Sequence, residues 1–222
     1  MSESEPREIR IPKGFRSEPF AYHEEIELKI DTLTNMGQGL GRRDGWVIMV
    51  RFALPGERIR ARIYRNDKNF SEADLIEVLE ASPDRVEAPC PVFGQCGGCQ
   101  YQHFDYDSQL AWKTRQVKEL LHHMVGIEAE VQPAIPSPKQ YGYRSKLTPH
   151  FPRPKDDNIV KIGFLRQGSR SSYVEIEQCP LISDPMNERL TELRERTEQA
   201  QLQKPFKKGG TLLIREHADG VT

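Results

Sequence analysis

The four cysteines of this 222-residue chain are the residues whose spacing points most clearly to chemistry. Cys90, Cys96 and Cys99 lie within ten residues of one another, and Cys179 follows them after a long interval. Three clustered thiols joined by a fourth from a distant segment are typical of an iron–sulfur site, because the cluster takes four thiolates and one loop can supply three. The spacing therefore favours an iron–sulfur cluster ligated by all four cysteines.

Zinc is the main alternative metal for these thiols. Structural zinc sites usually draw on two short cysteine pairs, whereas Cys179 has no close partner in the sequence. His103 follows the cysteine loop closely and is a candidate for the fourth ligand of a Cys3His site. Disulfides are disfavoured, because the charged N-terminus carries no secretion signal and the chain is therefore expected in the cytoplasm, where thiols stay reduced.

Composition and charge limit the classes of protein to which the chain can belong. Its net charge of −1 gives no overall positive field for a nucleic-acid partner, so local patches must supply one. The sequence contains no apolar stretch of about 18 residues, which predicts no membrane span. With 16 Gly and 16 Pro, short strands and turns are favoured over a helical bundle. We expect a mixed α+β monomer.

Apolar alternation predicts a small β-barrel over residues 23–82, after a disordered leader at residues 1–22. Ile26, Leu28 and Ile30 alternate with charged residues, as expected for a strand with one buried face. The glycine-rich run at residues 37–41 is expected to be a loop joining strands. Five short strands in about 60 residues fit an OB-like barrel.

Residues 83–222 are expected to form an α+β domain that carries the cysteines. One helix is predicted over 107–125, with Asp107 or Ser108 as its N-cap and Gly126 as its stop. A second is predicted over 185–201, with Asp184 as its N-cap and an apolar stripe on one face. A final strand then ends in an Asp219–Gly220 turn with two residues left. We therefore expect an unpaired hairpin and a chain truncated within this domain.

Two groups of basic residues are candidates for RNA contact. One is an arginine stripe on the barrel, for which a solvated face balanced by acidic residues is the alternative. The other is the segment 141–172, which has a local charge of +5 and interleaved aromatic residues. Cations bind phosphates and aromatic rings stack on unpaired bases, although an ordinary sheet has a similar pattern. The predicted RNA contacts are Arg42, Arg43, Arg58, Arg60, Arg62, Arg144, Lys146 and Arg166.

Taken in order, these motifs resemble the RNA (uracil-5-)-methyltransferase family, which acts on ribosomal or transfer RNA. The barrel is similar to the family's TRAM domain, and the run SPDRVEAPCPVFGQCGGCQYQH is similar to its cluster-binding loop nearly residue by residue. The resemblance covers roughly residues 23–222. It implies a barrel and a central domain that bind structured RNA. It also implies a four-iron four-sulfur cluster, with the ligands Cys90, Cys96, Cys99 and Cys179.

The same resemblance implies that a catalytic part is missing. Family members continue into a Rossmann-like domain that binds S-adenosylmethionine (SAM) and supplies a nucleophilic cysteine and an acidic base. This sequence shows no strand–glycine loop–helix unit for such a domain, and its four thiols are already assigned to the cluster. We therefore expect the N-terminal portion of such an enzyme, with its methyltransferase domain separate or missing and no catalysis by this chain alone. The alternative is a free-standing iron–sulfur module that binds RNA or senses redox state.

Overall fold

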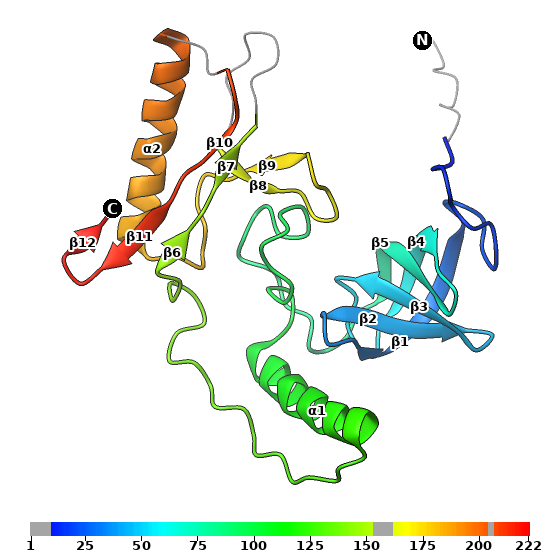
Figure 1. Ribbon diagram of the computed structural model, residues 1–222. Coiled ribbons are helices and arrows are strands. Elements are labelled where there is room, and N and C mark those ends of the chain that lie inside the picture. The colour runs from blue at the N-terminus through cyan, green and yellow to red at the C-terminus, as the bar shows by residue number, and fades with distance from the viewer. Residues whose placement is uncertain (1–9, 153–161, 204–206) are drawn as a thin grey trace. The chain divides into compact units, whose positions relative to one another are not determined.

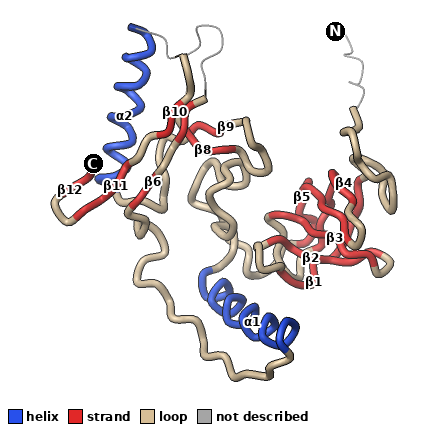
Figure 2. The backbone as a smooth tube through the Cα atoms, viewed as in Figure 1, coloured by secondary structure: helices blue, strands red, loops and turns tan. Residues whose placement is uncertain are grey.

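The computed structural model describes residues 10–152, 162–203 and 207–222, and these divide into two compact units. The first unit ends at Arg85 and the second begins at Val86. Figure 1 labels the elements of both units, and Figure 2 separates helices, strands and loops by colour. In the described part of the chain, neither helix is long and apolar enough to cross a membrane.

Five strands close a barrel in the first unit, with the neighbour order β1-β2-β3-β5-β4. The β3–β5 pair is parallel and the other four pairs are antiparallel. Closure leaves the sheet without free edges, which protects it from pairing with other chains. The five-stranded OB-like barrel predicted from the sequence is confirmed. Its strands are β1 (Glu25–Leu33), β2 (Gln38–Arg43), β3 (Trp46–Arg51), β4 (Arg58–Asn66) and β5 (Phe70–Glu80).

The barrel core follows the alternation seen in the sequence. On β1 and β4, every second side chain points inward and is at most 5% exposed, whereas the charged residues between them face outward. Burial of each large aliphatic side chain contributes about 1.5–3 kcal/mol, so these two strands supply much of the stability of the core. The inward residues are Ile26, Leu28, Ile30, Ile59, Ala61 and Ile63.

The glycine-rich run before Arg42 forms most of β2, so its assignment to a loop was wrong. A Cβ atom at Gly41 would lie 2.2 Å from the carbonyl oxygen of Lys29 on the neighbouring strand, and one at Gly39 would lie 2.8 Å from another backbone oxygen. Glycine is required here because the backbones approach too closely for any side chain. Arg42 and Arg43 consequently belong to a strand as well.

The chain is already packed before the first strand begins. Phe20 is 8% exposed in the barrel core, and Asn66 donates hydrogen bonds of 2.7 Å to the carbonyl oxygens of both Arg16 and Phe20. The disordered leader expected at residues 1–22 therefore extends too far toward the C-terminus, because Phe20 already packs in the barrel core. Residues 1–9 lie outside the described residues.

A buried ion pair fixes the end of the first unit to the barrel. The fully buried carboxylate of Glu57 accepts hydrogen bonds from Arg85 Nε and Nη2 at 2.5 and 2.9 Å. It also accepts the backbone N–H groups of Leu54 and Ser82 at 2.8 and 3.4 Å. Burial alone would raise the pKa of Glu57, but these hydrogen bonds and the Arg85 charge hold it below its ordinary value of 4.5.

The second unit combines two helices with short strands in two sheets. Every strand pair that the structure describes in this unit is antiparallel. The sheets have the orders β10-β7-β8-β9 and β12-β11-β6. The elements are α1 (Tyr106–Val125), β6 (Lys146–Leu147), β7 (His150–Phe151), β8 (Gly163–Leu165), β9 (Tyr173–Glu175), α2 (Asp184–Gln203), β10 (Gly210–Thr211), β11 (Ile214–His217) and β12 (Gly220–Val221).

Helix α2 anchors the core of this unit. Met186 and Leu190 are fully buried and pack with Leu147 and Ile214 of the adjacent sheet, as their helical spacing predicts. Figure 1 shows α2 beside β11. The N-terminal hydrogen bond differs from the expectation, because the hydroxyl of Ser183, one residue before the predicted cap, accepts the N–H of Met186 at 3.4 Å.

Helix α1 has the predicted extent but buries none of its side chains. Its N-cap is Asp105, whose carboxylate accepts the N–H of Ser108 at 3.1 Å, and not Asp107 or Ser108 as expected. Gly126 ends the helix with a φ of 66°, which confirms the predicted stop. Figure 2 shows that loop follows from this point to β6.

The last residues of the chain form a paired hairpin. Strand β12 pairs with β11 through Glu216 and Val221, and Arg215 exchanges backbone hydrogen bonds of 2.8 and 2.9 Å with Thr222. The expectation that this hairpin lacks its second strand was therefore wrong, because two residues after Gly220 suffice to pair it.

We predict that Arg85→Ala destabilises the barrel by about 3–5 kcal/mol, because the buried Glu57 carboxylate is left without its charged partner. Urea unfolding followed by the fluorescence of Trp46, which packs against the barrel core, measures the change. A Trp112→Phe background removes the signal of the other tryptophan.

Arg58→Ala is the matched control for this substitution. Arg58 forms exposed ion pairs with Glu27 and Glu80, and pairs of this kind contribute about 0–1 kcal/mol. A loss of stability in Arg85→Ala no larger than that in Arg58→Ala would show that the buried pair does not hold the barrel together.

The barrel should also lose stability on the acid side. Because the folded-state pKa of Glu57 lies below its ordinary value of 4.5, the stabilisation is complete above that pH and is lost as pH falls through the folded-state pKa. Urea midpoints measured between about pH 7 and pH 3 should show this loss. Glu57→Gln, which has no charge to titrate, should reduce the acid-side slope, and an unchanged slope would contradict the assignment.

Candidate metal centre

The four cysteines line one cavity of about 40 Å³ in the second unit. Three reach it from the loop that precedes α1, and Cys179 reaches it from the segment that precedes α2. The structure thus brings together the residues that the sequence singled out as metal ligands. Much of the remaining wall is apolar and consists of Val92, Phe93, Phe164, Ile176 and Leu181.

Consecutive tight turns give the cysteine loop its shape. The N–H of Phe93 donates to the carbonyl oxygen of Cys90 at 3.0 Å, and the N–H of Cys96 donates to that of Val92 at 2.9 Å. Gly94 adopts a φ of 80°, a left-handed conformation that other residues adopt at a cost. The turns therefore direct closely spaced thiols to one side of the loop.

Two backbone hydrogen bonds fasten this loop to the end of β8. The N–H of Gly97 donates to the carbonyl oxygen of Leu165 at 3.0 Å, and that of Gln167 donates to Gln95 at 2.7 Å. A Cβ atom at Gly97 would lie 3.2 Å from the Leu165 oxygen, so this close approach favours glycine. The loop is consequently fixed on both sides of Cys96.

Helix α2 positions the fourth thiol through Asn187. Its side-chain oxygen accepts the N–H of Cys179 at 2.9 Å, and its Nδ2 donates to the carbonyl oxygen of the same residue at 3.2 Å. Because Met186 and Leu190 anchor the helix in the core, the place of Cys179 depends on the packing of α2. Sequence reasoning missed Asn187, for which the available signal was its position in the first turn of the predicted helix.

Gln102 links two of the ligand candidates in the loop. It is 7% exposed, its Oε1 accepts the N–H of Cys90 at 3.2 Å, and its Nε2 donates to Cys99 Sγ at 3.1 Å. A hydrogen bond to sulfur favours the thiolate form that a metal requires. Sequence reasoning also missed this residue, because a glutamine near a cysteine has no distinctive spacing.

Burial raises the pKa of the Cys96, Cys99 and Cys179 thiols above their ordinary value of 9.0. The guanidinium of Arg144, which lines the same cavity, acts in the opposite direction on Cys96 and Cys179. A bound cation supplies the positive charge that lets such buried thiols ionise. Four soft sulfur donors suit iron–sulfur chemistry or zinc.

The structure does not bring His103 to the thiols. Its side chain is 4% exposed, its ring centroid lies 5.1 Å from that of Phe93, and it does not line the thiol cavity. Among the described residues, no three His, Cys, Asp or Glu side chains form a group that could hold a metal ion. A tetrahedral zinc ion would need its sulfurs about 3.8 Å apart, from Zn–S bonds of about 2.3 Å. The four thiols thus share a cavity without being gathered around one ion.

Most of the arginines predicted to contact RNA from the barrel have acidic partners. A phosphate would have to compete with these carboxylates, so the pairing favours the alternative of a solvated, charge-balanced face. Arg43 forms no ion pair within the described part of the chain, and RNA contact by the whole group stays a prediction. The pairs are Arg42–Asp31, Arg58–Glu27, Arg58–Glu80, Arg60–Glu77 and Arg62–Asp74.

The predicted RNA contacts of the second unit lie in different surroundings. Arg144 lines the thiol cavity, and Arg166 forms a backbone bridge with Cys96. Lys146 is exposed on β6, opposite Arg215 of β11. Part of the basic segment between them, at 153–161, lies outside the described residues.

Comparison with known proteins identifies the relatives of both units. The TRAM domain profile matches residues 23–76. A tRNA (uracil(54)-C(5))-methyltransferase from Schizosaccharomyces pombe is 37% identical over 210 residues, which cover 90% of this chain and 39% of the relative. The 23S rRNA (uracil(1939)-C(5))-methyltransferase RlmD from Shewanella denitrificans is 34% identical, covering 73% of this chain and 35% of the relative. The chain belongs to the RNA (uracil-5-)-methyltransferase family.

A solved structure supports the same membership. The crystal structure of the Pyrococcus abyssi tRNA (uracil-54, C5)-methyltransferase, in complex with S-adenosyl-L-homocysteine, aligns with a TM-score of 0.60 at 29% identity. The alignment covers 88% of this chain and 44% of that structure. The chain spans about two fifths of the length of the curated RNA (uracil-5-)-methyltransferases that it matches. The family resemblance and the TRAM domain expected from the sequence are thereby confirmed.

Proposed function

We propose that this chain is the RNA-binding, iron–sulfur part of a SAM-dependent RNA uracil-5-methyltransferase that acts on structured transfer or ribosomal RNA. The observation that carries the proposal is the convergence of four thiols, from two distant segments, on one cavity. Sequence identity of 37% to a tRNA uracil-C5-methyltransferase, over nine tenths of this chain, supports the assignment of the substrate class. A cytoplasmic location fits this role, since thiols kept for a metal require a reducing compartment.

The four sulfur donors that line the thiol cavity suit a four-iron four-sulfur cluster. Cys90, Cys96, Cys99 and Cys179 would each ligate one iron, and the apolar wall would limit access of water to the cluster. A cluster spreads its ligands over four irons, so its thiolates need not stand as close together as around a single ion. With every iron bound by thiolate, the cluster would leave no position open for substrate. Its role would be to hold the loop and α2 in the arrangement that binds RNA.

The described residues do not fit a SAM site. Nucleotide-type cofactors bind at the carboxyl ends of parallel strands connected by helices, whereas the strand pairs of the second unit are antiparallel. We therefore propose that SAM and the reacting groups belong to a catalytic domain outside these residues, on the same chain or on a partner. No step of methyl transfer is assigned to the residues described above.

Metal analysis tests the proposed function. The chain purified without oxygen should contain about four iron and four sulfide and absorb broadly near the border of the visible and ultraviolet ranges. Cys179→Ser should lose most of the iron, because it removes the ligand that joins α2 to the loop. Unchanged Trp46 fluorescence in this variant would show that the barrel remains folded. Stoichiometric zinc without iron or sulfide would overturn the cluster.

Gln102→Leu should shorten the lifetime of the cluster in air. The substitution removes the hydrogen bonds to Cys99 Sγ and to the N–H of Cys90 while keeping a side chain of similar size. Loss of visible absorbance after exposure to oxygen measures the lifetime. Gln132→Leu, at an exposed position before β6, is the matched control, and equal lifetimes in the two variants would remove Gln102 from the support of the centre.

A further inference from the structure

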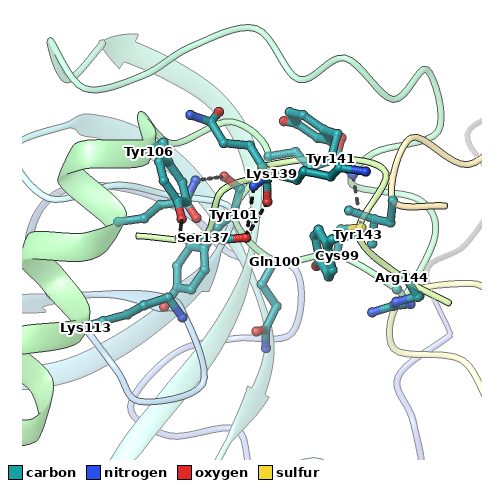
Figure 3. Close-up of a pocket in the computed structure, with 15 residues that line it drawn as sticks. Cys99, Gln100, Tyr101, Tyr106, Lys113, Ser137, Lys139, Tyr141, Tyr143 and Arg144 are labelled. Carbon is teal, nitrogen blue, oxygen red and sulfur yellow. Dashed lines mark hydrogen bonds between the residues drawn. The ribbon is translucent and has the colours of Figure 1, made fainter. Parts of the chain in front are cut away.

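A second cavity, of about 400 Å³, lies in the same unit and shares the Cys99 wall with the thiol cavity (Figure 3). Its volume is in the range of about 300–1,000 Å³ that is typical of small-ligand pockets. Its walls come from the cysteine loop, from α1 and from the segment before β6. The side chains that give it its chemistry are Tyr101, Tyr141, Tyr143, Lys113, Lys139 and Arg144.

The charge of this pocket differs from that of the barrel face. Three cations line it, and the described residues in its wall include no Asp or Glu. Lys113 and Lys139 form no ion pair within the described part of the chain, whereas Arg60 of the barrel is paired with Glu77. Cations around a cavity without compensating carboxylates attract a phosphate. Because Arg144 also faces the thiols, the two lysines are the principal phosphate contacts.

Aromatic rings face the cavity from two sides. Figure 3 shows Tyr141 and Tyr143 on one side and Tyr101 and Lys113 on the other. The residues Tyr141 and Tyr143 are 38% and 54% exposed, and Lys113 Nζ lies 5.8 Å from the centre of the Tyr101 ring. Exposed aromatic faces beside cations are suited to stacking a base whose phosphate is held nearby.

Hydrogen bonds fix the rim of the pocket in advance of any ligand. Tyr106 Oη on α1 accepts the N–H of Ser137 at 2.7 Å, and Ser137 Oγ donates to the carbonyl oxygen of Lys139 at 2.6 Å. Also on α1, Gln109 Nε2 donates to the carbonyl oxygen of Tyr101 at 3.2 Å. Preorganised walls reduce the entropy cost of binding a ligand.

We propose that this pocket binds one unpaired nucleotide of the RNA substrate, with its base stacked on Tyr141 and its phosphate held by Lys113 and Lys139. The proposal rests on the proposed function, from which it takes RNA as the ligand, and adds the place and the manner of contact. Stacking requires a base that has left its pair, so the pocket selects loops, bulges or ends over a continuous duplex.

Binding of a short, unstructured, fluorescently labelled RNA by the intact chain, purified without oxygen, tests this proposal. Tyr141→Ala should weaken binding about tenfold, whereas Tyr141→Phe, which keeps the ring, should bind like the wild type. Lys139→Ala should reduce the slope of log K against log salt by about 0.7, as expected for one lost phosphate contact on a single strand. Lys118→Ala, on α1 but outside the wall, is the matched control.

The outcomes separate the pocket from the proposed function. Wild-type affinity and salt slope in Tyr141→Ala and Lys139→Ala would overturn the pocket while leaving an RNA-binding chain. Failure of the wild type to bind any RNA, with its cluster intact, would instead overturn the proposed function. If Tyr141→Ala weakened the binding of a fully paired duplex as much as that of the single strand, base stacking would be refuted and the site would be a phosphate contact alone. If Tyr141→Ala loses iron, Lys113→Ala, on α1, replaces it and must show the reduced salt slope.

Discussion

The gathering of four thiols in one cavity is the constraint on which the second unit depends. The strands of this unit are two to four residues long, and such short pairings contribute little stability by themselves. What holds the cysteine loop is a set of contacts around the cavity, with Gln102 inside the loop and Asn187 on α2. Because burial disfavours the thiolate form of three of the cysteines, metal binding would supply folding free energy as well as a cofactor.

The two units differ in how their positively charged side chains are paired. On the barrel, cations and carboxylates face each other across neighbouring strands, so most of the arginines predicted to contact RNA are paired with a carboxylate, as Arg60 is with Glu77. Such exposed pairs add little to stability, and a phosphate would have to compete with their carboxylates. In the pocket of about 400 Å³ in the second unit, Lys113 and Lys139 line a wall whose described residues include no carboxylate. A count of basic residues along the sequence does not reveal this difference, because it depends on what each cation faces.

Strands and helices that show a regular apolar pattern can be predicted from the sequence. Features that depend on a residue far away in the sequence cannot. Alternation identifies the inward face of β1, and helical spacing identifies the buried stripe of α2. Gly41 looks like part of a loop until the Lys29 oxygen, 2.2 Å from its missing Cβ, explains why a strand needs glycine there. The cysteines were found from their spacing, whereas Asn187 and Gln102 are recognised by hydrogen bonds alone. Apolar residues recur at helical spacing in α1, yet none of its side chains is buried. Periodicity identifies the apolar face of a helix but does not identify what packs against that face.

The number of cysteines limits what these residues can do chemically. The chain has four thiols, and all four line one cavity, so a cluster that uses them leaves none to attack a pyrimidine ring. Among the described residues, the sheets of the second unit are antiparallel and likewise offer no end of parallel strands at which a nucleotide-type cofactor binds. What remains is a barrel, a thiol cavity and a cationic, aromatic pocket, which under the proposed function would together hold RNA. In this division of labour, the cysteine loop shapes both the metal centre and the pocket wall, so the cluster would contribute to RNA recognition through the structure of that wall.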